Sequence, residues 1–96
     1  MTDITEKQFM AQIKDLATTL GYRFYHPFNS MHSERGWPDC ALFRTGRFLL
    51  AELKTDKKTS ILSPAQESMI ADLRAAGVEV HVWRPSDFDE IVKVLR

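Results

Sequence analysis

The sequence predicts a three-layer α/β fold in which helices cover both faces of a central mixed sheet. Two apolar runs, residues 39–44 and 47–54, are separated by Thr45-Gly46, which is the pattern of a tight β-hairpin. Both runs are apolar on both faces, as expected of central strands that helices cover on two sides. A helical segment between the third and fourth predicted strands makes a crossover, which favours parallel pairing there. One of the two hairpin faces expected to be covered consists of Ala41, Phe43, Phe48 and Leu50.

The first third of the chain supplies a helix, a strand and a loop. Apolar residues at helical spacing predict a helix over residues 6–20, with Asp3 or Thr5 as its N-cap. The aromatic-rich residues 22–28 predict a strand. Residues 29–37 form a polar loop, and loops of this kind often carry binding and catalytic groups.

The last third predicts a helix, a strand and a final helix. Ser63-Pro64-Ala65-Gln66 combines an N-cap, a proline at the first helical position and a capping-box glutamine, and Gly77 follows the helix end. Residues 78–83 alternate as a strand, and Ser86 or Asp87 caps the last helix. The order α-β-β-β-α-β-α, without a linker, predicts one domain over residues 1–96.

Composition excludes several classes of protein. Thirteen basic and 13 acidic residues give no net charge, so bulk charge does not hold nucleic acid, although a local patch can. The single cysteine, Cys40, excludes a disulfide framework or a Cys-pair zinc site and suggests a reducing, cytoplasmic setting. No apolar run approaches the ~20 residues of a membrane span, so we expect no membrane partner. P-loop and GxSxG motifs are absent from the sequence, and no organic cofactor is expected.

The hairpin register brings two carboxylates together. A two-residue turn pairs Arg44 with Arg47 and, counting outward, Asp39 with Glu52, with Cβ atoms about 4.5–5.5 Å apart. Lys54 projects from the same face, and the Leu53 carbonyl lies between. Such hard oxygen ligands suit Mg²⁺ or Mn²⁺ and favour metal-assisted hydrolysis of a phosphodiester. The alternative is a turn aspartate after a proline, with Glu52 and Lys54 as solvated groups at a strand end.

These residues also carry a family resemblance. Gly36-Trp37-Pro38-Asp39, followed by Glu52-Leu53-Lys54, resembles the signature of the PD-(D/E)XK nuclease superfamily. Together with LSPAQ and LRAAGVEVHVWRPSDFDEI, it resembles the VRR-NUC family in its stand-alone phage and bacterial form. The resemblance implies a restriction-endonuclease-like fold and Mg²⁺- or Mn²⁺-dependent cleavage of DNA by homodimers that cut branched DNA such as Holliday junctions. It also implies metal ligation by Asp39, Glu52 and the Leu53 carbonyl, with Lys54 as the catalytic lysine.

Other residues have two interpretations each. By resemblance Gln66 belongs to the active site, whereas its spacing from Ser63 makes it a capping-box residue, and one side chain is not expected to serve both roles fully. Glu6 projects from the apolar stripe of the first helix toward a metal, or complements the helix dipole. His26 and Ser30 contact phosphate, or are uninvolved loop residues. Three basic side chains follow the DNA backbone or are solvated, namely Arg35, Lys57 and Lys58.

The favoured function is therefore a divalent-metal-dependent DNA endonuclease, acting as a homodimer on branched DNA. Two alternatives stay open. One is a nicking, flap or restriction-type nuclease that acts on other DNA structures. The other is a non-catalytic nucleic-acid-binding module of a larger assembly.

Overall fold

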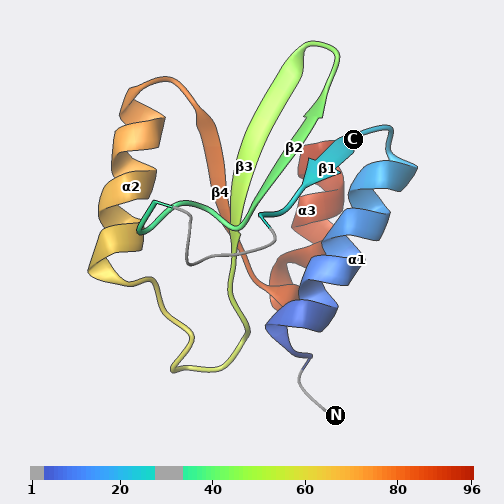
Figure 1. Ribbon diagram of the computed structural model, residues 1–96. Coiled ribbons are helices and arrows are strands. Elements are labelled where there is room, and N and C mark those ends of the chain that lie inside the picture. Colours follow the sequence, from blue (N-terminus) through green and yellow to red (C-terminus); the bar gives the residue numbers. More distant parts are fainter. Residues whose placement is uncertain (1–3, 28–33) are drawn as a thin grey trace.

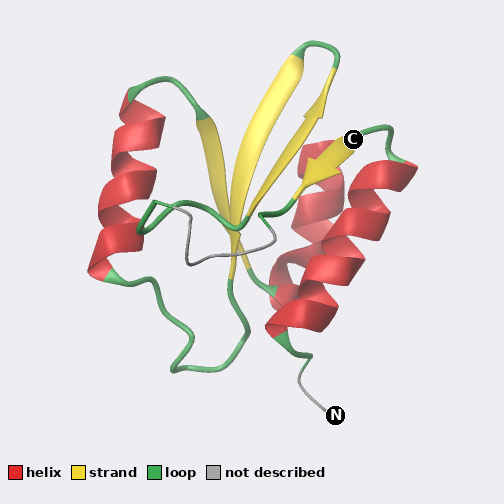
Figure 2. Cartoon of the chain, in the orientation of Figure 1, coloured by secondary structure: helices red, strands yellow, loops and turns green. Residues whose placement is uncertain are grey.

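In the described residues the elements appear in the expected order, and a short 3-10 turn precedes the last helix. The computed structural model describes residues 4–27 and 34–96 (Figures 1 and 2). Its elements are α1 (Glu6–Thr19), β1 (Arg23–Tyr25), β2 (Cys40–Arg44), β3 (Arg47–Leu53), α2 (Pro64–Ala75), β4 (Glu79–Trp83), the 3-10 turn η2 (Pro85–Asp87) and α3 (Phe88–Leu95). None of the helices in the described part of the chain has the length and apolar character that a membrane crossing requires.

The four strands form one mixed sheet in the order β1-β2-β3-β4. β1 pairs with β2 and β2 with β3 in antiparallel fashion, whereas β3 and β4 run parallel, as expected from the crossover through α2. Figure 1 shows α2 on one side of the sheet and α1 and α3 on the other. The predicted three-layer arrangement with a mixed central sheet is therefore confirmed.

The hairpin has the register that its two-residue turn predicts. Arg44 pairs with Arg47, and Cys40 pairs with Ala51. Because side chains alternate along a strand, successive hairpin residues face opposite sides of the sheet, and each side has its own core. The larger core packs α1 and α3 on the sheet and includes Phe9, Ile13, Leu42, Leu49, Leu53, Ile91 and Leu95, and the smaller core beneath α2 consists of Ala41, Leu50, Ile70 and Val80.

The expectation that helices cover the whole hairpin is wrong at its outer end. Ala41 and Leu50 are buried beneath α2, but Phe43 is 37% exposed and Phe48 53% exposed. The reason is that α2 packs on β4 and on the inner half of the hairpin, and does not extend to the turn. The two phenyl rings contact each other instead, with centroids 6.3 Å apart.

The predicted helix starts are confirmed for α1 and α2, and α3 begins directly after Asp87 as predicted but lacks the expected side-chain cap. Thr5 caps α1 in a capping box with Gln8, and Ser63 caps α2 in the same way with Gln66. Neither Ser86 nor Asp87 caps α3 through its side chain. The Asp87 carboxylate instead accepts a hydrogen bond from the Arg84 N–H, and so stabilises the η2 turn that precedes the helix.

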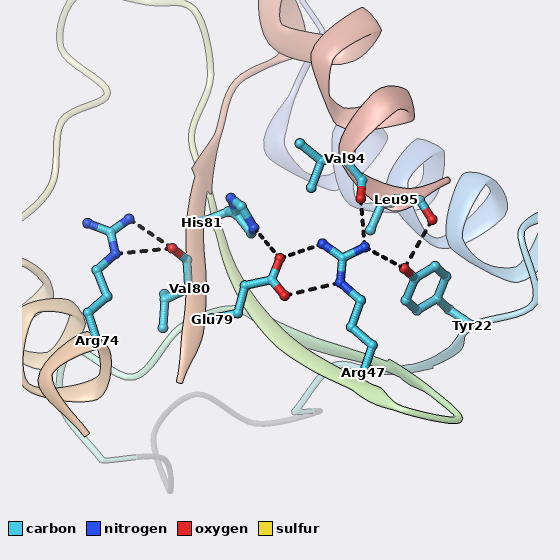
Figure 3. Close-up of polar contacts among 8 residues, drawn as sticks. All are labelled: Tyr22, Arg47, Arg74, Glu79, Val80, His81, Val94 and Leu95. Atoms are coloured by element: carbon cyan, nitrogen blue, oxygen red, sulfur yellow. Dashed lines mark hydrogen bonds and ion pairs between the residues drawn. The ribbon is translucent and has the colours of Figure 1, made fainter. Parts of the chain in front are cut away.

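A set of paired charges joins the sheet to α3 at the end remote from Asp39 (Figure 3). The Arg47 guanidinium makes two hydrogen bonds to the Glu79 carboxylate, of 3.1 and 2.6 Å, and a third of 2.9 Å to the Tyr22 hydroxyl. Tyr22 in turn donates to the Leu95 carbonyl, and His81 donates to Glu79. The Arg47 contact lowers the pKa of Glu79, so both groups stay charged and paired.

Gly36 brings the segment before β2 against the first turn of α2. Its φ of +86° lies in the left-handed region, and a Cβ at this position would collide with the Ala65 carbonyl oxygen. The segment that leads to Asp39 is therefore held against the helix that carries Gln66. Close backbone approach is thus a physical reason for glycine at this position.

We predict that Gly36→Ala lowers the free energy of unfolding more than Gly46→Ala does. Gly46 also has a positive φ, of +82°, but no atom lies within 4 Å of its added Cβ, so its substitution costs only backbone strain of about 1 kcal/mol. Gly36→Ala adds a collision with backbone to the same strain. Urea unfolding of both variants measures the difference, and equal losses would show that the close approach is not constrained.

Candidate active site

The predicted site residues meet at one end of the sheet, where β2 begins and β3 ends. Asp39 immediately precedes β2, Glu52 and Leu53 close β3, and Lys54 follows. The Asp39 Oδ2 accepts a hydrogen bond of 2.8 Å from the Leu53 N–H, which fixes this carboxylate against the end of β3. The structure thus brings Asp39, Glu52, Leu53 and Lys54 together, while their roles in a reaction stay a prediction.

The Glu52 carboxyl group is buried at the end of β3. It is 1% exposed and is the only polar or charged residue among those that are buried there. Its Oε2 accepts a 3.2 Å hydrogen bond from Gln66 Nε2 and lies 3.8 Å from Lys54 Nζ. The other oxygen, Oε1, is buried without a hydrogen-bond donor among the described residues. A buried acceptor without a donor costs free energy, and a proton, a cation or a bound water would remove this cost.

The surroundings of Glu52 favour its neutral form in the absence of a cation. Burial first, and then the neighbouring Asp39 carboxylate, raise the pKa of Glu52 to about 9. The Lys54 ammonium lowers the pKa of Glu52 but does not cancel this increase, and the charge of Glu6 raises the pKa by a smaller amount. Burial first, and then Asp39 and Glu52, also raise the pKa of the Cys40 thiol, which stays neutral in the core.

Gln66 contacts both the helix cap and the site. Its Oε1 accepts a 2.9 Å hydrogen bond from the Ser63 N–H, and its Nε2 donates to Glu52. The expectation that one side chain cannot fully serve both is wrong for its hydrogen bonds, because a carboxamide accepts at one atom and donates at the other, while a role of Gln66 in a reaction stays a prediction. The capping box therefore orients the amide so that its NH₂ group faces the carboxylate.

His26 contacts the main chain of Asp39. Its Nδ1 lies 2.8 Å from the Asp39 carbonyl oxygen, and because a carbonyl only accepts, Nδ1 carries the proton. Tyr25 pairs with Ala41, so the register continues to Pro27 opposite Asp39, and proline has no N–H to donate. The imidazole supplies a donor there. Sequence reasoning chose His26 as a phosphate contact and missed this role, for which the following proline was the available signal.

A cavity of about 430 Å³ adjoins the carboxylates. Glu6, His26, Asp39 and Leu53 line it together with Lys7 and Met10. The structure therefore places Glu6 beside the site, as expected if it projects toward a metal. Across residues 4–27 and 34–96, no three His, Cys, Asp or Glu side chains form a ready-made cation cage. Mg²⁺ does not need one, since it is bound by one or two carboxylates and keeps several waters.

The remaining predicted residues are spread around the site. Arg35, Lys57 and Lys58 are exposed, and the structure brings none of them into an ion pair with a described residue. The loop that carries Lys57 and Lys58 is tied to the segment after β4 by hydrogen bonds from Arg84 to the Thr55 carbonyl and from Ser86 to Asp56. Ser30 lies outside the described residues.

The raised pKa of Glu52 predicts that stability falls with rising pH in metal-free protein. The folded pKa of about 9 exceeds the unfolded value of 4.5, so the folded chain binds the extra proton and loses this advantage as pH rises between the two values. We expect the free energy of unfolding, measured in urea with a chelator, to fall by a few kcal/mol between about pH 5 and about pH 9. Glu52→Gln should flatten this slope, whereas the exposed Glu67→Gln should keep it. An unchanged slope in Glu52→Gln would contradict the assignment.

The His26 contact predicts a graded effect on cation binding. His26→Ala removes the donor to the Asp39 carbonyl and should weaken Mn²⁺ binding by roughly tenfold, the lower end for groups that orient ligands. His26→Asn keeps an amide donor near Nδ1 and should recover most of the affinity. Calorimetric titration measures both, with His81→Ala as a control remote from Asp39. Equal affinity in wild type and His26→Ala would mean that the contact does not position Asp39.

Comparison with known proteins adds a structural likeness. No protein-family model matches the chain, and no curated protein matches it in sequence. The structure is similar to that of Hjc from Archaeoglobus fulgidus, a Holliday junction resolvase from an archaeal hyperthermophile. The TM-score is 0.58 at 21% sequence identity, and the match covers 81% of this chain and 67% of the Hjc chain. The likeness confirms that the chain has a restriction-endonuclease-like fold, with its mixed sheet between helices.

Proposed function

We propose that this chain is a divalent-metal-dependent endonuclease of the VRR-NUC family that hydrolyses phosphodiester bonds in DNA. The observation that carries the proposal is the buried Glu52 carboxylate, with one oxygen lacking a donor, beside Asp39 and Lys54. A like-charge pair of this kind is costly in a fold unless a cation joins it. The similarity to a Holliday junction resolvase supports DNA as the substrate.

The donor set fits Mg²⁺ or Mn²⁺. Asp39, Glu52 and the Leu53 carbonyl would hold the ion, with Glu6 at the cavity rim. When bound, the ion supplies Lewis-acid polarisation of the phosphate and a more acidic bound water.

The chain's own residues prepare the site for this chemistry. The Leu53 N–H fixes the orientation of Asp39, and Gln66 fixes that of Glu52. Lys54 is mostly buried, so its ammonium acts in a medium of low polarity, where it stabilises charge that develops on the phosphate. Because Lys54 lies 3.8 Å from Glu52, beyond hydrogen-bond distance, its N–H donors stay available to substrate.

The substrate is branched DNA such as a Holliday junction, cut by a homodimer in the cytoplasm of a bacterial or phage-infected cell. A four-way junction has paired strands to cut, and a two-fold assembly supplies two matched sites as well as a larger contact surface than one small domain offers. The similarity to Hjc supports this preference.

We expect substitutions at the site to separate cation binding from turnover. Asp39→Ala and Glu52→Ala remove ligands and should abolish cleavage and weaken Mn²⁺ binding. Lys54→Ala should lower the cleavage rate by roughly 10²–10³-fold, as when one charge-stabilising donor is removed, and still bind Mn²⁺. Lys93→Ala, an exposed lysine of α3, is the matched control. Near-normal turnover in Lys54→Ala would remove this residue from the reaction.

The deciding experiment is cleavage of a labelled four-way junction and of a linear duplex with matched arms, in Mg²⁺, Mn²⁺ or chelator. Paired, metal-dependent cuts confined to the junction in wild type, and absent in Asp39→Ala, would support the resolvase activity. Preference for nicks, flaps or linear duplex would favour the other nuclease types. Binding without cleavage of any substrate would favour a non-catalytic module. Sedimentation at working concentration tests the homodimer separately.

A further inference from the structure

A groove leads away from the carboxylates along α1 and β1. The cavity beside Asp39 shares Lys7, Met10 and His26 with a second cavity of about 430 Å³. The second cavity extends to Lys14 on α1 and Phe24 on β1. The two hollows therefore form one surface feature, here called the α1–β1 groove, which is open to the candidate active site at one end.

The helical wall of this groove carries cations that bind no acidic partner in the described structure. Lys7 and Lys14 are both exposed and lie two helical turns apart on one face of α1. Neither forms an ion pair with any residue of the described ranges, whereas Lys93 on α3 pairs with Glu90 at 3.4 Å. The carboxylates of Glu6 and Asp39 line the end of the groove beside the site, so its positive charge lies along the stretch from Lys7 to Lys14.

The groove also has an apolar component between its cations. Met10 and Phe24 are half-buried, and both contribute to its lining. A surface with positive side chains over an apolar base complements a nucleic-acid strand, which carries anionic phosphates and flat apolar bases. The rise of 1.5 Å per helical residue separates Lys7 from Lys14 by about 10.5 Å. That distance equals about three base-pair rises of 3.4 Å along the axis of a DNA duplex.

We propose that the α1–β1 groove binds one strand of the DNA substrate, with its phosphate backbone along Lys7 and Lys14. The strand enters the site past His26, so the phosphate that follows the bound segment reaches Asp39 and Glu52. This assignment rests on the proposed nuclease function and adds a binding track to it. It also gives a role to two lysines that lie outside the PD and ExK motifs.

The test is the salt dependence of junction binding by the Lys7→Gln/Lys14→Gln double variant. Binding of a labelled four-way junction is followed by fluorescence anisotropy in Ca²⁺, between about 50 and about 200 mM KCl. Loss of two phosphate contacts in each protomer, four in the homodimer, should weaken binding by roughly tenfold per protomer and reduce the slope of log K against log salt by about 2.8–3.6. Lys93→Gln should leave both quantities unchanged. Urea unfolding should show that the double variant is folded, since surface substitutions of this kind change stability by about 0.5 kcal/mol or less.

The outcomes separate the groove from the nuclease activity. An unchanged slope in the double variant, or an equal change in Lys93→Gln, would overturn the groove proposal even if wild type cleaves junctions. A reduced slope in the double variant, with wild type unable to cleave any DNA, would keep the groove as a binding site and overturn the proposed reaction. A wild type that binds no DNA would overturn both.

Discussion

The placement of two carboxylates side by side at one end of the sheet is the constraint on which the site depends. The two-residue turn and the resulting hairpin register leave Asp39 and Glu52 no other relative position. Glu52 is buried, and neither the Lys54 ammonium nor the Gln66 amide satisfies both of its oxygens. A proton on Glu52, a bound cation or a buried water would each complete this site.

At the opposite end of the same sheet, the charged groups form complete ion pairs and hydrogen bonds. Arg47 and Glu79 are joined by two hydrogen bonds (Figure 3). Arg47 also donates to the Tyr22 hydroxyl, and His81 donates to the Glu79 carboxylate. The pKa of Glu79 is lowered there, whereas that of Glu52 is raised. The contrast indicates that the incomplete pairing of Glu52 is a functional feature, because its Oε1 has no donor among the described residues although Lys54 Nζ lies 3.8 Å from Oε2, and carboxyl groups with strongly raised pKa values are typical of active sites.

Local patterns predicted most of the fold, and tertiary packing decided the rest. Thr45-Gly46 and strand alternation were enough for the register, and the crossover helix for the parallel β3–β4 pair. The exposure of Phe43 and Phe48 depends on how far α2 extends over the sheet, which no local pattern encodes. For the same reason the sequence placed Gln66 in competing roles, and the contact of His26 with a main-chain carbonyl was signalled only by the proline that follows it.

We propose that Asp39 and Glu52 hold a divalent cation in exchange for a proton. Calorimetric titration of Mn²⁺ near pH 7, in two buffers of different ionisation enthalpy, measures both affinity and proton release. We expect one Mn²⁺ per chain to bind with release of about one proton, because the pKa of Glu52 lies near 9 before binding. Glu52→Gln should bind Mn²⁺ weakly and release no proton. Absence of Mn²⁺ binding by wild type, or binding unaffected by Glu52→Gln, would contradict the account.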